Sequence, residues 1–237
     1  MSAYAGTPSR VSDLIREMRR ELLENTGRTK VCYLCSKALE DPINSDHIPP
    51  KRFFAPSIRR RYNLDKLLTA KVHEQCNESY RMDEEYLVYA LMAYIRGSDA
   101  GLALYNHILY KYKQGENVAL VRQVLAEFER NPSGLYIPGG QLLQRWDGER
   151  IRRVAWKIVR GLHYHRTGEV LRQDLSVSWT VTTPDDEKPP DHFLAFRDLS
   201  KNPELGYYPG VFAYRFQIFP ELNNGPIGHC YSGIVSL

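Results

Sequence analysis

Three cysteines and one histidine form two pairs of the kind that bind zinc. Cys32 and Cys35 are separated by two residues, and His73 and Cys76 have the same spacing. Three thiolates and one imidazole suit a tetrahedral zinc ion closed to water. We therefore predict a structural Cys3His zinc site. Two other interpretations are open: a redox C-x2-C motif, although no βαβ pattern surrounds it, and an ordinary surface histidine beside a small buried Cys76.

The segment between the two pairs carries polar residues suited to phosphate chemistry. Residues 46–51 are Asp-His-Ile-Pro-Pro-Lys, Asn63 follows His47 by 16 positions, and Asn77 comes directly after the second zinc pair. The order C-x2-C, D-H-I-x-P, N and H-x2-C-N resembles the HNH endonuclease motif, in the variant whose last position is asparagine. The resemblance implies a ββα-metal nuclease core.

The resemblance covers about residues 32–81 and departs from the usual pattern at one position. Zinc-bearing members usually have a cysteine where this chain has His73. Histidine is an acceptable zinc ligand. A zinc ion would staple the hairpin to the helix, because a segment of about 50 residues has little core of its own.

The resemblance also implies a role for each polar residue in phosphodiester hydrolysis. The unperturbed pKa of histidine lies close to neutrality, so His47 is the expected general base that deprotonates water. Asp46 and Asn77 offer the oxygen ligands that Mg²⁺ or Mn²⁺ prefers, and such an ion acts as a Lewis acid. In the family the middle asparagine orients the histidine, so Asn63 takes that role here.

Basic residues cluster beside the predicted catalytic histidine. Five of them lie between His47 and Asn63: Lys51, Arg52, Arg59, Arg60 and Arg61. They could grip phosphates on either side of the cut, although a solvated loop is the alternative. On a helix over 74–82, Arg81 shares a face with Asn77 and could contact the phosphate as well, or be a plain surface charge.

Charge and composition agree with a soluble nucleic-acid-binding protein. The chain has a net charge of only +4, but residues 1–82 contain 15 Lys and Arg against 10 Asp and Glu. This local excess favours a polyanionic partner. No run of about 18 apolar residues exists, and the first ten residues lack the apolar region of a secretory signal. We expect a cytoplasmic protein without disulfides, in which Cys230 is a buried strand residue.

The elements that must position these residues follow from periodicity and turn signals. Turn signals and the lack of a long helical period in residues 30–72 predict short strands and loops. Helices are predicted between Thr7 and Gly27 and over 74–82, 84–97, 101–113, 117–130 and 147–165. Alternating β-forming residues over 176–183, 211–219 and 228–237 predict a small antiparallel sheet.

We therefore predict an α+β protein with two regions. Residues 1–82 hold an N-terminal helix and the zinc-stapled HNH core. Residues 83–237 hold a helical segment and a C-terminal antiparallel sheet of unknown role.

The predicted function is metal-dependent hydrolysis of phosphodiester bonds in DNA, with structural zinc and catalytic Mg²⁺ or Mn²⁺. One alternative is a zinc-stabilised nucleic-acid-binding module without catalysis, although a pure binder has no need of Asp46, His47 and Asn77 together. Another is an RNase or toxin that uses the same site on RNA. A homodimer is possible, and no membrane association is expected.

Overall fold

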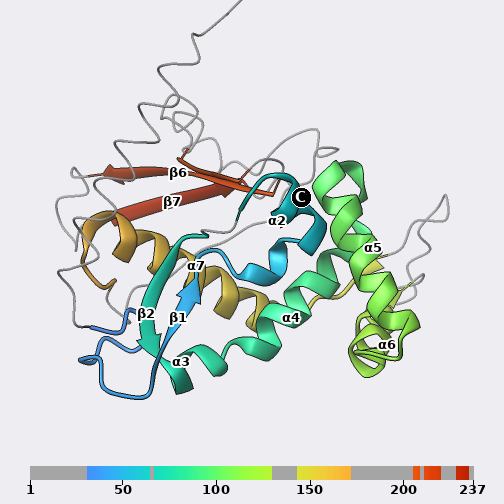
Figure 1. Cartoon of the computed structure of the whole chain (residues 1–237), viewed down its shortest axis with the longest axis horizontal. Coiled ribbons are helices and arrows are strands. Elements are labelled where there is room, and N and C mark those ends of the chain that lie inside the picture. The colour runs from blue at the N-terminus through green and yellow to red at the C-terminus, as the bar shows by residue number, and fades with distance from the viewer. Residues whose placement is uncertain are drawn as a thin grey trace, which may run out of the picture.

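The computed structural model describes residues 31–64, 67–129, 143–171, 205–208, 211–219 and 228–234. The elements in this part of the chain are β1 (Ile43–His47), η1 (Lys51–Phe53), α2 (Pro56–Arg61), β2 (Thr69–His73), α3 (Glu74–Glu78), α4 (Arg81–Ala90), η2 (Leu91–Ala93), η3 (Ile95–Gly97), α5 (Asp99–Lys113), α6 (Val118–Ala126), β3 (Phe128–Glu129), β4 (Leu143–Gln144), α7 (Gly148–Thr167), β5 (Leu205–Tyr208), β6 (Phe212–Phe219) and β7 (Gly228–Ile234) (Figure 1). They form an α+β protein with small antiparallel sheets, as predicted. The helix predicted between Thr7 and Gly27 and the strand over 176–183 lie outside the described residues.

A short hairpin and a helix follow one another where the sequence places the chemistry. β1 and β2 are antiparallel, with Ile43 opposite His73 and His47 opposite Thr69. α3 begins directly after His73, whose extended backbone forms the N-cap of the helix. The second zinc pair therefore spans the end of β2 and the first turn of α3, while His47 ends β1.

Two of the predicted helices of the middle segment are interrupted. The helix predicted over roughly 74–82 is shorter, because α3 ends at Glu78 and α4 begins at Arg81 with Tyr80 as its N-cap. The helix predicted over 84–97 stops at Ala90 and continues as two 3-10 turns. The side chain of Ser98 then caps α5 by accepting a hydrogen bond from the Gly101 amide, so a new helix starts there.

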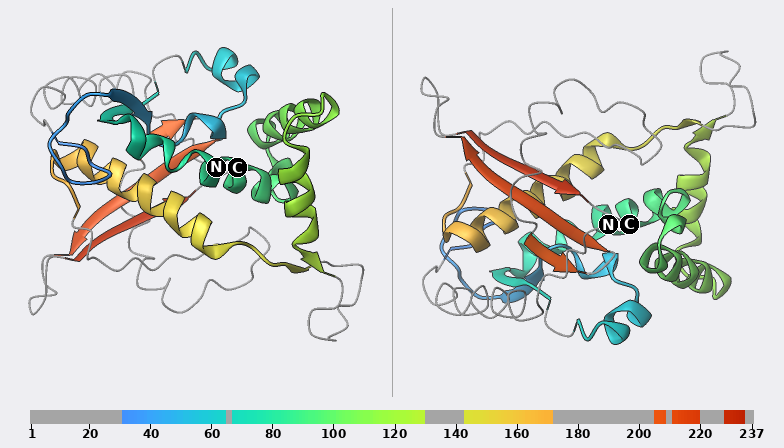
Figure 2. Two further views of the ribbon diagram at one scale, coloured as in Figure 1. Left: turned by 90° about the horizontal axis from the view of Figure 1, so that it is seen from below. Right: turned by 90° about the horizontal axis from the view of Figure 1, so that it is seen from above.

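α7 joins segments that are far apart in the sequence. Asp147 caps its first turn and Gly168, with φ 76°, ends it, and both residue types favour these positions. Figures 1 and 2 show α7 running between the β1–β2 hairpin and the sheet of β5, β6 and β7. The ring of Tyr164 stacks on Tyr33 with centroids 5.8 Å apart, which packs the helix on the first zinc pair.

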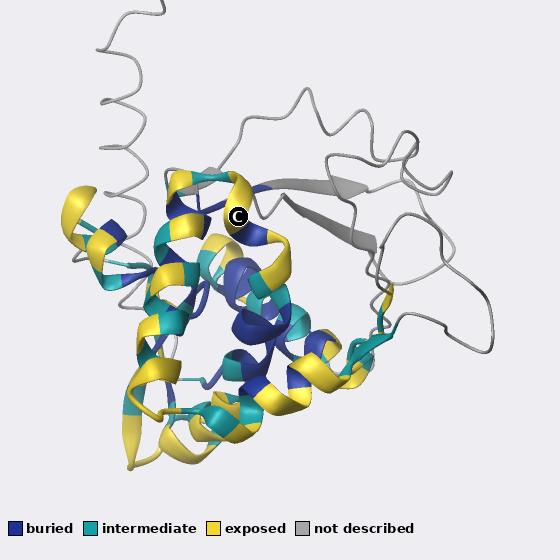
Figure 3. Ribbon diagram, turned by 90° about the vertical axis from the view of Figure 1, so that its right-hand side faces the viewer, coloured by how far each residue is buried: buried dark blue, intermediate teal, exposed yellow. Residues whose placement is uncertain are grey.

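The hydrophobic core is continuous across the expected regional boundary at residue 82. That boundary falls inside α4, and buried residues before and after it belong to one cluster. Figure 3 shows these buried residues gathered along the inner faces of the helices, with exposed residues outside. No helix in the described part of the chain combines the length and apolar character needed to cross a membrane.

The C-terminal strands form a three-stranded antiparallel sheet in the order β5-β6-β7. The strands predicted over 211–219 and 228–237 are confirmed as β6 and β7, whereas β5 is not among the predicted strands. This sheet is tied to the segment around the hairpin. The Tyr208 hydroxyl accepts a hydrogen bond from the Leu68 amide at 2.9 Å, and its ring meets Phe54 edge-on at 5.1 Å. Val211 and Phe212 are buried in the common core.

Gly161 controls how closely α7 approaches the residue after His47. A Cβ at this position would lie 2.8 Å from the side chain of Ile48, which is 1% exposed. We expect Gly161→Ala to lower the free energy of unfolding by about 1–3 kcal/mol, because overpacking outweighs the gain in helix propensity. Gly97→Ala is the control, since a Cβ there would meet nothing within 4 Å. Urea denaturation of both variants tests this, and equal stabilities would contradict it.

Candidate metal centre and active-site cavity

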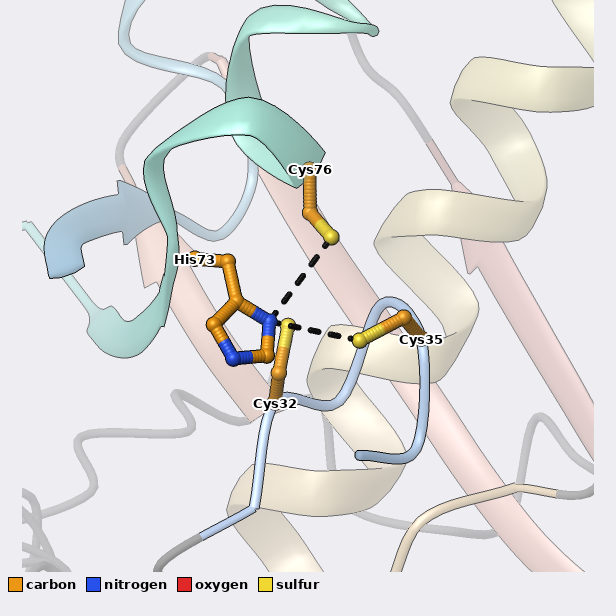
Figure 4. Close-up of side chains that lie close together, drawn as sticks. All are labelled: Cys32, Cys35, His73 and Cys76. Atoms are coloured by element: carbon orange, nitrogen blue, oxygen red, sulfur yellow. Dashed lines mark hydrogen bonds between the residues drawn. The ribbon is translucent and has the colours of Figure 1, made fainter. Parts of the chain in front are cut away.

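The two predicted zinc pairs meet at one point (Figure 4). One ligand atom from each of Cys32, Cys35, His73 and Cys76 lies within 4.8 Å of all the others. His73 Nδ1 faces the cluster, at 3.3 Å from Cys35 Sγ and 3.9 Å from Cys76 Sγ. Its Nε2 donates a hydrogen bond to the Ala38 carbonyl oxygen at 2.8 Å. This Cys3His group could hold a zinc ion, and the carbonyl fixes the imidazole as outer partners of zinc-bound histidines do.

A tight turn holds the first zinc pair in place. The Cys32 amide donates to the Lys37 carbonyl, and the Ser36 amide donates to the Cys32 carbonyl, both at 2.8 Å. Ser36 takes a left-handed conformation with φ 65°. The guanidinium of Arg160, on α7, donates to the Leu34 carbonyl at 2.6 Å. The turn is therefore held by a residue 126 positions later in the sequence. The other zinc pair, His73 and Cys76, completes the ligand set, which a lone redox motif would not need.

A cavity of about 370 Å³ opens beside the hairpin. Asp46, His47 and Asn77, the residues predicted to perform catalysis, all line it. Asp46 is buried at 3% exposure, whereas His47 is half-buried. Three of the five predicted phosphate-binding residues line the same cavity: Lys51, Arg52 and Arg59.

The surroundings of His47 favour its neutral form. Burial lowers the pKa of His47, and so does the charge of Lys51, while Asp46 opposes the change. A neutral imidazole is the form that accepts a proton.

Lys157 lies at the centre of a buried polar cluster that the sequence did not reveal. Its ammonium is 1% exposed and donates to Asp46 Oδ1 at 2.8 Å, to Asn77 Oδ1 at 3.2 Å and to the carboxylate of Glu84. The Tyr33 hydroxyl donates to the other oxygen of Asp46. One cation therefore gathers two carboxylates and an amide from three different elements.

Lys157 belongs to a row of cations along α7. The row also contains Arg150, Arg153 and Arg160, at steps of three and four residues that place them on one helix face. Arg150 Nε lies 2.9 Å from Asp83 Oδ1, and Arg153 donates to the Ser79 carbonyl. The apolar stripe of this helix is accompanied by a second stripe of charges at the same period, and that second stripe is the sequence signal for these cations.

Several predicted site residues lie away from the cavity. Asn63 is exposed in a left-handed turn with φ 51° after α2, and does not line the cavity. Arg81 is exposed, pairs with Glu78 at 3.1 Å and does not line the cavity. Arg61 pairs with Asp99 at 3.2 Å, and neither it nor Arg60 lines the cavity.

Comparison of the chain with protein-family models, curated proteins and solved structures gives no match. The resemblance to HNH endonucleases therefore depends on the residues and spacing of the motif itself.

The zinc group makes a direct prediction. Cys35→Ala should lose the ion and melt at a much lower temperature, because structural zinc supplies much of the folding free energy of a small module. His73→Cys should keep one zinc per chain, since a fourth thiolate is an equivalent ligand. Cys230→Ser, in β7, is the control and should keep it too. Zinc is measured by atomic emission after dialysis, and a full equivalent in Cys35→Ala would refute the site.

The Lys157 cluster predicts a large effect on stability. Lys157→Ala leaves the carboxylates of Asp46 and Glu84 buried together without their cation, which should cost about 3–5 kcal/mol. Arg152→Ala, on the exposed face of the same helix, removes only a surface pair with Glu149 and should change stability by less than about 1 kcal/mol. Chemical denaturation compares the two, and similar effects would contradict the assignment.

Proposed function

We propose that this protein is a metal-dependent endonuclease of the HNH type that hydrolyses phosphodiester bonds, chiefly in DNA. The observation that supports it most is the cavity, because Asp46, His47 and Asn77 line it together. These three residues come from β1 and α3 and are 31 positions apart at the extremes. Their meeting in one cavity with three cations is what cleavage of a phosphodiester needs.

The order of elements is also the order that the family resemblance implies. A hairpin is followed directly by a helix, and the Cys3His group lies where β2 joins α3. The histidine expected to be catalytic ends β1, and the last asparagine of the motif lies on α3. This arrangement supports a ββα-metal core for residues 32–78.

The oxygen donors fit a catalytic divalent cation. Asp46, Asn77 and Glu84 converge on one ammonium, and all three line the cavity. Carboxylate and amide oxygens are the ligands of Mg²⁺ and Mn²⁺. When bound, such an ion would stabilise the negative charge that develops on the phosphate and leaving oxygen. Lys157 is a positioning residue, because its buried ammonium holds the three oxygen donors in place.

Side chains of the cavity would carry out proton transfer and phosphate binding. His47 takes a proton from the attacking water, for which its neutral imidazole is suited. Lys51, Arg52 and Arg59 bind the phosphate oxygens and keep the bond near the imidazole. Arg52 is also held by Glu85 at 3.3 Å, which fixes its position beside the cavity.

The alternative of a non-catalytic zinc module explains less of the structure. Burying two carboxylates and a lysine costs several kcal/mol of desolvation for each ion. A protein that only binds nucleic acid gains nothing from acidic groups in its binding cavity, because they repel phosphate. The two carboxylates outnumber the single ammonium of Lys157 that they share, which favours a further cation over binding alone.

Plasmid cleavage tests the proposal. Purified protein should nick or linearise supercoiled plasmid with Mg²⁺ or Mn²⁺ and should not do so after these ions are withdrawn. His47→Ala should reduce the rate by at least about 100-fold, the usual contribution of a general base, while its zinc content and melting temperature stay unchanged. Asn63→Ala is a useful control, because Asn63 does not line the cavity. Full activity in His47→Ala would refute the role of the histidine.

An RNA substrate is compared in the same assay. Cleavage of single-stranded RNA without cleavage of DNA would reassign the enzyme as an RNase that uses the same site. Absence of cutting on plasmid, single-stranded DNA and RNA would refute the nuclease.

A further inference from the structure

The cavity extends past the predicted catalytic residues to a wall that the motif does not include. α5 contributes His107 and Lys111, together with the apolar residues Leu104 and Ile108. None of these residues belongs to the HNH-like segment, and α5 lies beyond α4 from the hairpin (Figures 1 and 2). The wall presents a histidine and a lysine side by side, since they are one helical turn apart.

Arg59 bridges the motif and this wall. Arg59 lines the cavity together with His47, from the motif, and His107, from α5. Its Nε is shielded from solvent and has no hydrogen-bond partner among the residues that the structure describes. A buried donor without an acceptor is costly, so an acceptor supplied by a ligand would stabilise it.

The contacts of α5 leave its wall of the cavity without an acidic side chain. The exposed pair between Arg61 and Asp99 joins α2 to α5 at 3.2 Å. Lys111 pairs with Glu116 at 3.1 Å, and the Glu116 side chain is 52% exposed. Neither Asp99 nor Glu116 lines the cavity, and the acidic residues that do line it lie on β1 and α4. A phosphate at this wall is therefore bordered by Arg59, His107 and Lys111.

The size of the cavity limits what can enter it. About 370 Å³ lies near the lower end of the range for ligand pockets, which is room for roughly one nucleotide. A paired base does not fit such a space, so a duplex must open locally at the cut before one of its strands can enter, as enzymes that act in narrow pockets require.

We infer that Arg59, His107 and Lys111 form a second phosphate subsite that holds a single nucleic-acid strand next to the bond attacked at His47. The identity of the attacked bond rests on the proposed nuclease function, whereas phosphate binding at this subsite does not. The strand places one phosphate at Lys51 and Arg52 and the neighbouring phosphate against α5. The recognised chemistry is the phosphodiester backbone, which DNA and RNA share.

Binding is tested in the full-length His47→Ala protein, so that no cleavage intervenes. The probes are a fluorescein-labelled 20-residue oligothymidylate, the corresponding oligouridylate and a blunt 20-base-pair duplex, each followed by fluorescence anisotropy. Arg59→Gln and Lys111→Gln should each weaken binding of the oligothymidylate about tenfold, the loss of one charge-assisted hydrogen bond. Each should also flatten the salt dependence by about 0.7 in the logarithmic slope. The duplex should bind about tenfold more weakly than the single strand.

Two control variants accompany these measurements. Lys113→Gln lies two residues from Lys111 on α5, and Arg122→Gln lies on α6; both side chains are exposed and neither lines the cavity. Both should bind within about twofold of the parent protein. Melting temperature and zinc content verify that every variant is folded.

The outcomes separate this inference from the proposed function. If plasmid is cut but Lys111→Gln and Arg59→Gln bind like the controls, the nuclease stands and the α5 subsite falls. If nothing is cut but both variants lose affinity and salt dependence, the subsite stands and the nuclease falls. Equal affinity for duplex and single strand would overturn the preference for a single strand. The oligouridylate shows whether the subsite distinguishes RNA from DNA.

Discussion

The candidate active site depends on one buried ammonium. Lys157 reaches from α7 to Asp46 on β1, Asn77 on α3 and Glu84 on α4, so a single cation sets the relative positions of three elements. Two carboxylates cannot be buried together without a neighbouring positive charge, because their repulsion and desolvation are strong at low dielectric. α7 is therefore part of the site, although Lys157 lies 80 residues after Asn77 in the sequence.

The same helix connects this cluster with the metal centre. Arg160 holds the turn between Cys32 and Cys35 one helical turn beyond Lys157, and Gly161 lets the helix approach Ile48. The Cys3His group in turn joins that turn to the start of α3, which carries Asn77. A zinc ion in the Cys3His group would therefore influence where the oxygen donors lie. Both depend on how α3 and the turn between Cys32 and Cys35 pack against α7.

Both acidic and basic side chains line the cavity. Asp46 and Glu84 offer oxygens that favour a hard cation. Arg59, Lys51 and Lys111 favour phosphate. Both signs of charge act on His47, because burial and then Lys51 lower its pKa while Asp46 opposes them. The imidazole therefore shares one cavity with groups suited to a cation and groups suited to phosphate.

The sequence by itself determined the features that depend on short spacing. The zinc pairs and the caps of α7 at Asp147 and Gly168 involve residues a few positions apart, whose geometry is set by local backbone preferences. The tertiary structure alone decided that Lys157, Glu84 and His107 join the site and that Asn63 and Arg81 do not line the cavity. Contacts between distant segments depend on how helices pack, and no local pattern shows that Lys157 of α7 will meet β1, α3 and α4.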